Sequence, residues 1–147
     1  MTTSKKARAA ARLAAVQALY QHEMEATPPA TLLDEFHRHR LGAEIDDDQY
    51  AQADVAFFDD VVKGVIARRE EIDAVIAEKL AQGWALGRLD KTMLQILRAG
   101  CYELMARPDV PTGAAITEYL DVAHAFFDQR EAKFVNGVLD AVGRAVR

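Results

Sequence analysis

Apolar residues recur along most of this chain at spacings of three and four positions, and no stretch alternates apolar and polar residues. The first pattern is typical of an amphipathic α-helix, whereas alternation is typical of a half-buried strand. We therefore predict an all-α fold of about seven helices. The expected helices cover residues 4–25, 31–41, 55–66, 72–80, 90–107, 111–126 and 133–142.

Prolines, glycines and charged segments mark the expected helix ends. Pro28 ends the first helix because proline cannot continue the hydrogen-bond ladder, and Thr31 is the expected N-cap of the second. Gly42 ends the second helix. The charged segment at 67–71 predicts a break between two helices, and "DQRE" at 128–131 predicts a polar break before the last one.

The segment "QGWALGRL" at residues 82–89 contains two glycines and is the main predicted connection. It divides a single domain, residues 1–147, into helical subdomains at 1–82 and 83–147. A chain of 147 residues of which half are hydrophobic is long enough to bury one sizeable core.

The last predicted helix contains the segment "KFVNGVLDAV" at 133–142. We expect four of its residues to form the core face, namely Val135, Val138, Leu139 and Val142. Asn136 and Gly137 are poor helix formers within this stripe. We expect Gly137 to permit the close approach of a neighbouring helix, and Asn136 to bond buried backbone or a loop.

Cysteine usage and hydropathy argue against a disulfide-rich, a zinc-binding or a membrane-spanning protein. The single cysteine, Cys101, excludes an internal disulfide framework and a Cys-rich zinc site. Because it lies in an apolar run, we expect a buried and inert thiol. No apolar run approaches the 18 or more residues that a membrane span needs. We read the N-terminus as part of a mature helix, and we expect a cytoplasmic protein.

Charge is segregated along the chain, although the net charge is only −5. Residues 1–22 hold four cations and no acid, namely Lys5, Lys6, Arg8 and Arg12, which we call the basic arm. Residues 44–60 hold seven acids and no base. This arrangement suggests contact with a polyanion at one end of the protein. Composition alone fits a solvated basic helix start equally well.

A catalytic or metal site finds little support in the residue pattern. His37 and His39 are two positions apart on a predicted helix, so they point in different directions and cannot share a metal. The run Asp46–Asp48 lacks the glycine and distal glutamate of a calcium loop. Phosphate-binding loops and nucleophile elbows are also absent from the sequence. We therefore predict a protein that is not an enzyme, with no metal and no cofactor.

Two groups of residues are candidates for nucleic-acid binding. Lys5, Arg8 and Arg12 have the spacing of one helical face, so they can neutralise consecutive phosphates. In "QREAKF" at 129–134, the second group, Arg130, Lys133 and Phe134 come together at a helix start. Such a start suits single-stranded RNA, because cations bind phosphates while a base stacks on the ring. The apolar pattern alone favours a core position for Phe134.

A third feature is the charged helix start "RLDK" at 88–91, together with Tyr20 on the first helix. It suits either a contact with another protein or a simple helix cap by Asp90, and the residues alone favour the cap.

Four segments, in this order along nearly the whole chain, resemble the bacterial transcription antitermination factor NusB family. They are "AVQALYQHEME" (15–25), "RLDKTMLQILRAGCYEL" (88–104), "DVPTGAAITEYLDVAHAFF" (109–127) and "KFVNGVLD" (133–140). The resemblance implies an all-α fold of two helical subdomains and no catalysis. It also implies binding of boxA-type single-stranded RNA in ribosomal RNA leaders together with the small-subunit ribosomal protein NusE. This complex joins other Nus factors and RNA polymerase, and so supports processive transcription of ribosomal RNA operons.

The resemblance also assigns residues. It implies RNA contact by Lys5, Lys6, Arg8, Arg12, Arg130, Lys133 and Phe134. Tyr20 and Asp90 match positions on the side of the ribosomal protein. Ala9 and Ala10 occupy part of a cluster that is often richer in arginine in the family, which would reduce the number of phosphate contacts. The alternative is a helical protein–protein adaptor without RNA binding, and a homodimer is a further candidate assembly.

Overall fold

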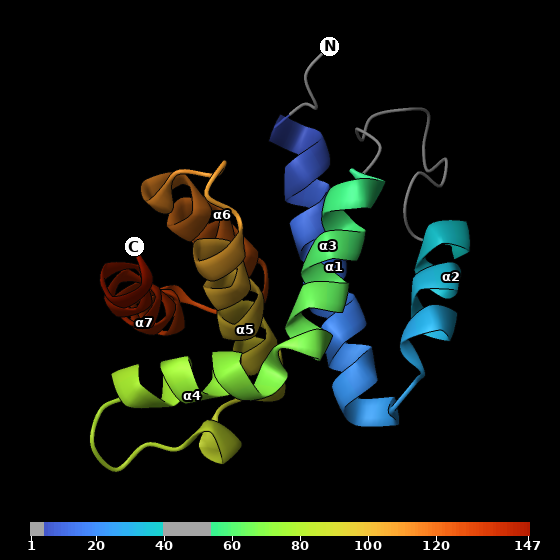
Figure 1. Ribbon diagram of the computed structural model, residues 1–147. Coiled ribbons are helices and arrows are strands. Elements are labelled where there is room, and N and C mark those ends of the chain that lie inside the picture. The colour runs from blue at the N-terminus through green and yellow to red at the C-terminus, as the bar shows by residue number, and fades with distance from the viewer. Residues whose placement is uncertain (1–4, 40–53) are drawn as a thin grey trace. The chain divides into compact units, whose positions relative to one another are not determined.

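The computed structural model describes residues 5–39 and 54–147, and every regular element within them is helical (Figure 1). The elements are α1 (Lys5–Glu25), α2 (Pro29–His39), α3 (Val55–Ala67), α4 (Arg69–Lys79), the 3-10 turn η2 (Leu86–Arg88), α5 (Lys91–Ala106), α6 (Thr112–Phe126) and α7 (Gln129–Val146). The predicted all-α fold of about seven helices is confirmed. The predicted end of the second helix at Gly42, and four of the seven acids of residues 44–60, lie outside the described residues.

The chain divides into two compact units, Met1–Lys63 and Gly64–Arg147. This division falls within α3, whereas we expected it at the connection after residue 82. The helix α4 belongs to the second unit because it packs against α5 and α7. An ion pair reinforces this packing: the Arg98 guanidinium on α5 donates to both carboxylate oxygens of Asp73 on α4, at 2.8 and 2.9 Å.

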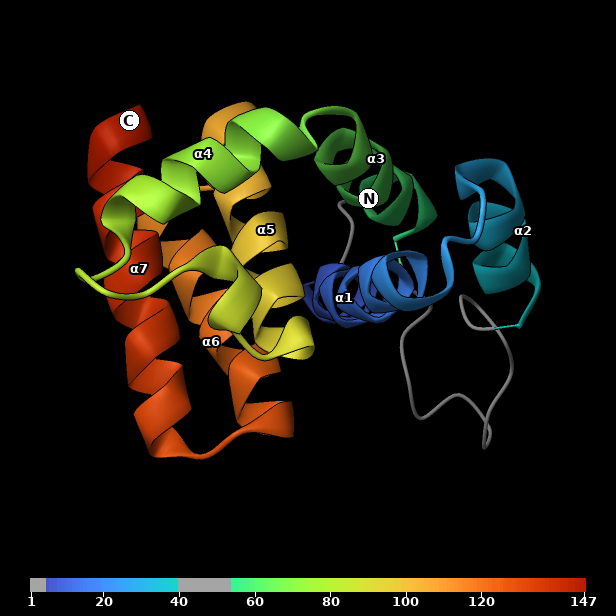
Figure 2. The same cartoon turned by 90° about the horizontal axis from the view of Figure 1, so that it is seen from below.

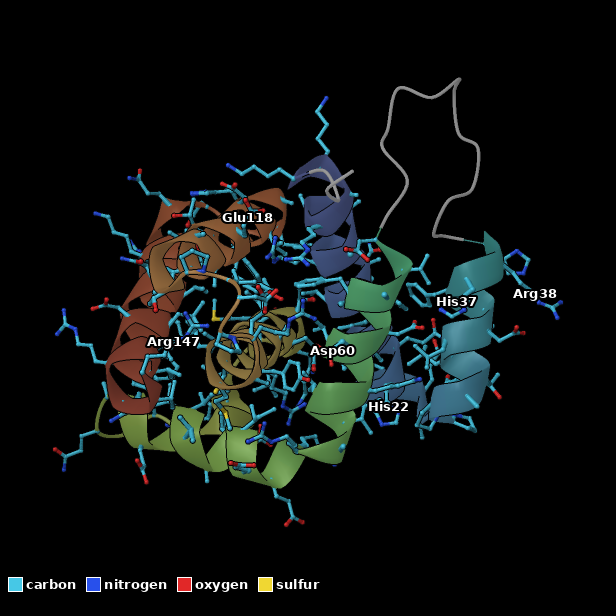
Figure 3. All side chains as sticks on the ribbon, turned by 45° about the horizontal axis from the view of Figure 1, so that its top comes forward. His22, His37, Arg38, Asp60, Glu118 and Arg147 are labelled. Carbon is cyan, nitrogen blue, oxygen red and sulfur yellow. The ribbon has the colours of Figure 1, made fainter. Side chains whose placement is uncertain are left out.

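In the first unit, α1 packs against α2, and aromatic and polar contacts link α2 to α3. The rings of Phe36 and Phe58 are stacked with their centroids 5.6 Å apart. Beside them lies His37 on α2 (Figure 3), whose Nε2 is 2.7 Å from Asp59 Oδ1. These contacts bury Phe36 and leave the histidine partly exposed at the edge of the unit.

In the second unit, α5, α6 and α7 pack against one another, and α4 crosses α5 and α7 (Figure 2). Every residue of α5 from Met93 to Leu104 is buried, as expected for the central helix of a bundle. Gly100 explains how closely α5 and α7 approach, because a Cβ built there would lie 2.9 Å from Leu139 Cδ1. We expected this role for Gly137, but that prediction is wrong: a Cβ at Gly137 would meet nothing within 4 Å.

Side-chain caps fix two helix starts in the second unit. The Asp90 carboxylate accepts hydrogen bonds from the backbone N–H groups of Thr92 and Met93, at 2.8 and 3.1 Å, so the predicted cap of α5 is confirmed. The Asp128 carboxylate accepts from Arg130 N at 3.0 Å and starts α7 at Gln129. A break before the last helix is present, but it covers residues 127 and 128, and the remainder of the predicted segment 128–131 is the first turn of α7.

Two other helix starts also differ from prediction. The helix α2 begins at Pro29 rather than after Thr31, because proline suits the first turn, where its missing N–H has no intrahelical partner. Pro111 precedes α6 as its N-cap residue.

The side chain of Arg147, at the end of α7, caps the C-terminal end of α5. The Arg147 guanidinium donates to the carbonyl oxygens of Leu104, Val110 and Arg107 at 2.9, 2.7 and 2.7 Å (Figure 3). Carbonyl groups at a helix C-terminus have no intrahelical partner, so this side chain satisfies them. It thereby fastens the end of α7 to the end of α5.

Burial confirms the predicted inert thiol. The Cys101 side chain lies wholly inside the second unit's core, and burial raises its pKa to about 12. Phe126, the last residue of α6, is 43% exposed. None of the helices in residues 5–39 and 54–147 has the length and apolar character needed to cross a bilayer.

Candidate nucleic-acid interface

The helix α7 has one buried face and one exposed face. The buried face contains Val135, Val138, Leu139 and Val142, as predicted. Arg130, Lys133, Asn136 and Gly137 are exposed. The weak helix formers Asn136 and Gly137 therefore lie on the exposed face of α7 and do not pack against a neighbouring helix in the described part of the chain. The predicted bond of Asn136 to buried groups is not found among the described residues.

Lys133 lies at the edge of a shallow groove between α6 and α7. The groove has a volume of about 150 Å³ and is lined by Leu120, His124, Gln129, Ala132, Lys133 and Asn136. Gln129, Lys133 and Asn136 follow one another at helical spacing, so one face of α7 forms a polar wall. The groove therefore presents a cation and amide groups, which can bind phosphate or sugar oxygens.

Phe134 is only partly buried, and its ring lies against Trp84. The ring centroids are 6.2 Å apart and the planes are tilted by 45°. Phe134 is thus not part of the main core stripe, which its pattern had favoured. Arg130 precedes Phe134 by four positions, so the two side chains start from the same face of α7.

Trp84 is a candidate that sequence reasoning missed, because its flanking glycines indicated only a turn. It is 53% exposed. The signal in the sequence was a single large aromatic residue in a glycine-containing connection between helices, where a packed position is not assured.

The charges at the start of α7 are arranged around its cap. A side-chain hydrogen bond with Glu131, followed by the backbone N–H of Arg130, holds the pKa of Asp128 below its usual value of 3.8. The cap therefore stays ionised at neutral pH. Within the described part of the chain, neither the Arg130 guanidinium nor the Lys133 ammonium group lies at ion-pair distance from a carboxylate. Both cations remain available to an anionic ligand.

The basic arm is arranged differently. Lys5 and Lys6 are exposed at the start of α1. Arg8 Nε lies 3.4 Å from Asp54 Oδ2, and its guanidinium carbon lies 4.7 Å from the centroid of the Phe57 ring. The Arg12 guanidinium lies 4.8 Å from the same centroid, and Arg12 is only 3% exposed. The predicted row of arginines exists on α1, but both guanidinium groups are engaged with residues at the start of α3.

The two residues predicted for a protein partner lie in different units. Tyr20 is 39% exposed on α1, and Met24, one turn later, is also exposed. The pair forms a small apolar surface on the first unit. Asp90 is exposed in the second unit, with one carboxylate oxygen engaged in its cap.

Histidines and acids do not assemble into a metal centre in the described residues, since no group of three or more could hold an ion. His22 on α1 instead lies with Nδ1 2.9 Å from Thr27 O (Figure 3). His37 is engaged with Asp59, and the neighbouring Arg38 pairs with Asp34 within α2.

Comparison with known proteins gives the family. The profile of the NusB family matches residues 9–144. The "Transcription antitermination protein NusB" of Novosphingobium aromaticivorans is 75% identical over 144 residues, which is 98% of this chain and 97% of that protein. The protein of the same name from Sphingopyxis alaskensis is 66% identical over 147 residues, covering 100% of this chain and 99% of that protein.

Solved structures agree with the sequence relatives. The chain is similar to T. maritima NusB with a TM-score of 0.78 and 28% identity, over 98% of this chain and 93% of the other. It is also similar to a chain in a crystal structure of the antitermination factors NusB and NusE in complex with dsRNA. That match has a TM-score of 0.77 and 25% identity, over 97% and 99% of the two chains. The present chain therefore belongs to the NusB family of transcription antitermination proteins, which are not enzymes.

Proposed function

We propose that this protein binds boxA-type single-stranded RNA of ribosomal RNA leaders together with the ribosomal protein NusE. The complex then supports processive transcription of ribosomal RNA operons, in contact with other Nus factors and, indirectly, RNA polymerase. The observation that carries the proposal is the start of α7, where exposed Arg130 and Lys133 flank the partly exposed ring of Phe134. Cations beside a stacking surface suit unpaired RNA, whose bases are free to leave the helix stack.

The basic arm contributes phosphate contacts in this proposal. Lys5 and Lys6 are exposed and can reach phosphates directly. Arg8 and Arg12 are proposed contacts as well, but their guanidinium groups lie over Phe57, so RNA contact requires a change of rotamer. The solved complex of NusB and NusE with dsRNA supports the proposal, since a chain of similar fold binds RNA alongside that partner.

Tyr20 and Asp90 are the proposed contacts for NusE. The exposed pair of Tyr20 and Met24 offers apolar surface, as interface centres commonly do. The same surface suits the alternative function, a helical adaptor without RNA binding, and a homodimer in which α1 pairs with a second copy. We expect the protein to act in the cytoplasm, where ribosomal RNA is transcribed.

A gel-shift titration of boxA-type RNA, with and without purified NusE, tests the function. We expect saturable binding that NusE strengthens, and weaker binding by Phe134→Ala and by Arg8→Ala. Phe126→Ala is the matched control, because Phe126 is also an exposed aromatic residue of the second unit. If Phe134→Ala and Arg8→Ala both bind as the unmodified protein does, the RNA site is misplaced. Binding of NusE without any RNA shift would favour the adaptor.

A further inference from the structure

Trp84 presents its ring from a connection whose backbone is well defined. The backbone N–H of Trp84 donates to Ala81 O at 3.0 Å, and Gly83 takes a φ of 91°, a conformation that suits glycine. Arg88 Nη1 donates to Gly83 O at 3.4 Å, which ties the later part of the connection back to its start. These local hydrogen bonds fix the backbone of the connection. The Trp84 side chain that it presents is at the surface, since 53% of the residue is exposed.

The ring of Trp84 meets Phe134 without closing over it. The centroid separation of 6.2 Å and the tilt of 45° leave parts of both rings uncovered. We call these two side chains the aromatic platform. A pair that served only to pack the connection onto α7 would bury the indole more fully, because a Trp ring carries a large apolar area. The uncovered ring surface can instead receive a flat ligand.

A second aromatic pair in the same unit shows what is particular to the platform. The rings of Phe126 and Phe127 are 6.4 Å apart and tilted by 52°, and Phe126 is 43% exposed. The geometry is nearly the same, but the next residue in the chain is the acidic Asp128. The charged residues near the platform include Arg88, which bonds within the Trp84 connection, and Arg130 and Glu131, which precede Phe134 by four and three positions on α7. Of these two aromatic pairs, the platform is the one with an arginine bonded into the same connection as one of its rings.

The surface of α7 beside the platform is open. Gly137 follows Phe134 by three positions, on the same face, and a Cβ there would meet nothing within 4 Å. The glycine therefore contributes no packing within the protein, and it leaves bare backbone next to the Phe134 ring. A sugar or base could approach the helix closely at this point.

We propose that Trp84 is a further RNA-contacting residue. One unpaired base stacks on the platform formed by Trp84 and Phe134, and Arg88 and Arg130 contact the phosphates on either side of that base. This inference rests on the proposed RNA-binding function and extends the site from α7 to the connection between α4 and α5. Stacking on an aromatic ring is tolerant of base identity, so Trp84 adds affinity more than sequence preference.

The chain itself provides a direct readout, because Trp84 is its only tryptophan. Intrinsic emission is followed while boxA-type RNA is added, with the complex of a Trp84→Phe variant as the blank for any partner emission. We expect the emission to fall and to saturate at the RNA concentration where the gel shift saturates. Irradiation of RNA that carries 5-iodouracil is expected to cross-link the RNA to the peptide that contains Trp84, as identified by mass spectrometry.

Affinity measurements with matched variants complete the test. Trp84→Leu is expected to weaken RNA binding about tenfold, as loss of one base–aromatic stack does, while Trp84→Phe retains most of the affinity. Phe126→Leu, in the second aromatic pair, is expected to bind RNA normally. Thermal unfolding of each variant, followed by circular dichroism, establishes that the compared proteins are folded.

The outcomes separate this inference from the function on which it rests. If RNA shifts the protein in the gel but leaves the Trp84 emission and the Trp84→Leu affinity unchanged, the inference is overturned and the function stands. If no RNA binding occurs with or without NusE, both fall. If Trp84→Leu is unfolded, the emission titration and the cross-link decide, and an unchanged emission with a cross-link confined to peptides without Trp84 overturns the inference.

Discussion

The starts of α1 and α7 use the same residue types in opposite ways. Each combines cations with a nearby phenylalanine. At α1, the guanidinium groups of Arg8 and Arg12 lie 4.7 and 4.8 Å from the centroid of Phe57. At α7, the ring beside Phe134 is another aromatic ring, and Arg130 and Lys133 extend into solvent.

This difference separates cations that hold the fold from cations that can hold a ligand. A guanidinium group over a ring, beside a carboxylate, has lost much of its hydration and gains from protein contacts instead. An exposed cation keeps its hydration and can exchange it for a phosphate at little structural cost. We therefore expect substitutions at α1 to change stability first, and substitutions at α7 to change RNA binding first.

The largest expected effect is on stability at α1. Arg12→Ala removes a side chain that is 3% exposed and stacked over Phe57, so we expect the free energy of unfolding to fall by about 2 kcal/mol. Arg130→Ala removes an exposed side chain and should change it by less than about 0.5 kcal/mol. Urea denaturation followed by circular dichroism measures both. Equal losses of stability in the two variants would remove the distinction between the regions.

A glycine substitution tests whether the surface of α7 is open at Gly137. Gly137→Ala should raise the free energy of unfolding by about 1 kcal/mol, because alanine favours the helix and its Cβ meets nothing within 4 Å. Gly100→Ala is the matched control in the same unit. Its Cβ would lie 2.9 Å from Leu139, so this variant should be destabilised. If Gly137→Ala also loses stability on thermal unfolding, the surface of α7 at this position is not open.

Periodicity was sufficient to predict the helices, the inner residues of α7 and the burial of Cys101 in α5. Val135, Val138, Leu139 and Val142 are buried, and Asp90 caps α5, as expected. Both results follow from local rules, because helical spacing and an acidic residue before a helix act over only a few positions. The start of α7 was predicted too late, because Gln129 and Arg130 are polar and their helical state depends on the Asp128 cap.

The candidate site was harder to predict, because contacts between distant segments decide which of its cations and rings are exposed. Nothing in the spacing of Arg8 and Arg12 indicates that both would lie over Phe57, about 45 positions later. Likewise, Trp84 and Phe134 are far apart in sequence, and only the fold places their rings together. Local patterns identify which residues can bind RNA, whereas burial and pairing decide which of them remain available.

The smallest expected effect is on the salt dependence of RNA binding, and it tests availability directly. Each phosphate contact contributes about −0.7 to the slope of log affinity against log salt for a single strand. Lys133→Gln and Arg130→Gln should each reduce the slope by about that amount, and Arg8→Gln by less, because Arg8 pairs with Asp54 at 3.4 Å.

Asp54→Asn makes this prediction specific to the ion pair. The amide oxygen can still accept the hydrogen bond that Asp54 Oδ1 accepts from Phe57 N at 3.0 Å, so the start of α3 is kept while the charge is removed. Arg8 is then freer to contact RNA, and the slope should become steeper. Arg8→Gln in this background should reduce it by close to the full 0.7 or so of one phosphate contact. Affinities measured at four or more salt concentrations give each slope. An unchanged slope in Asp54→Asn would show that the carboxylate does not withhold Arg8 from RNA.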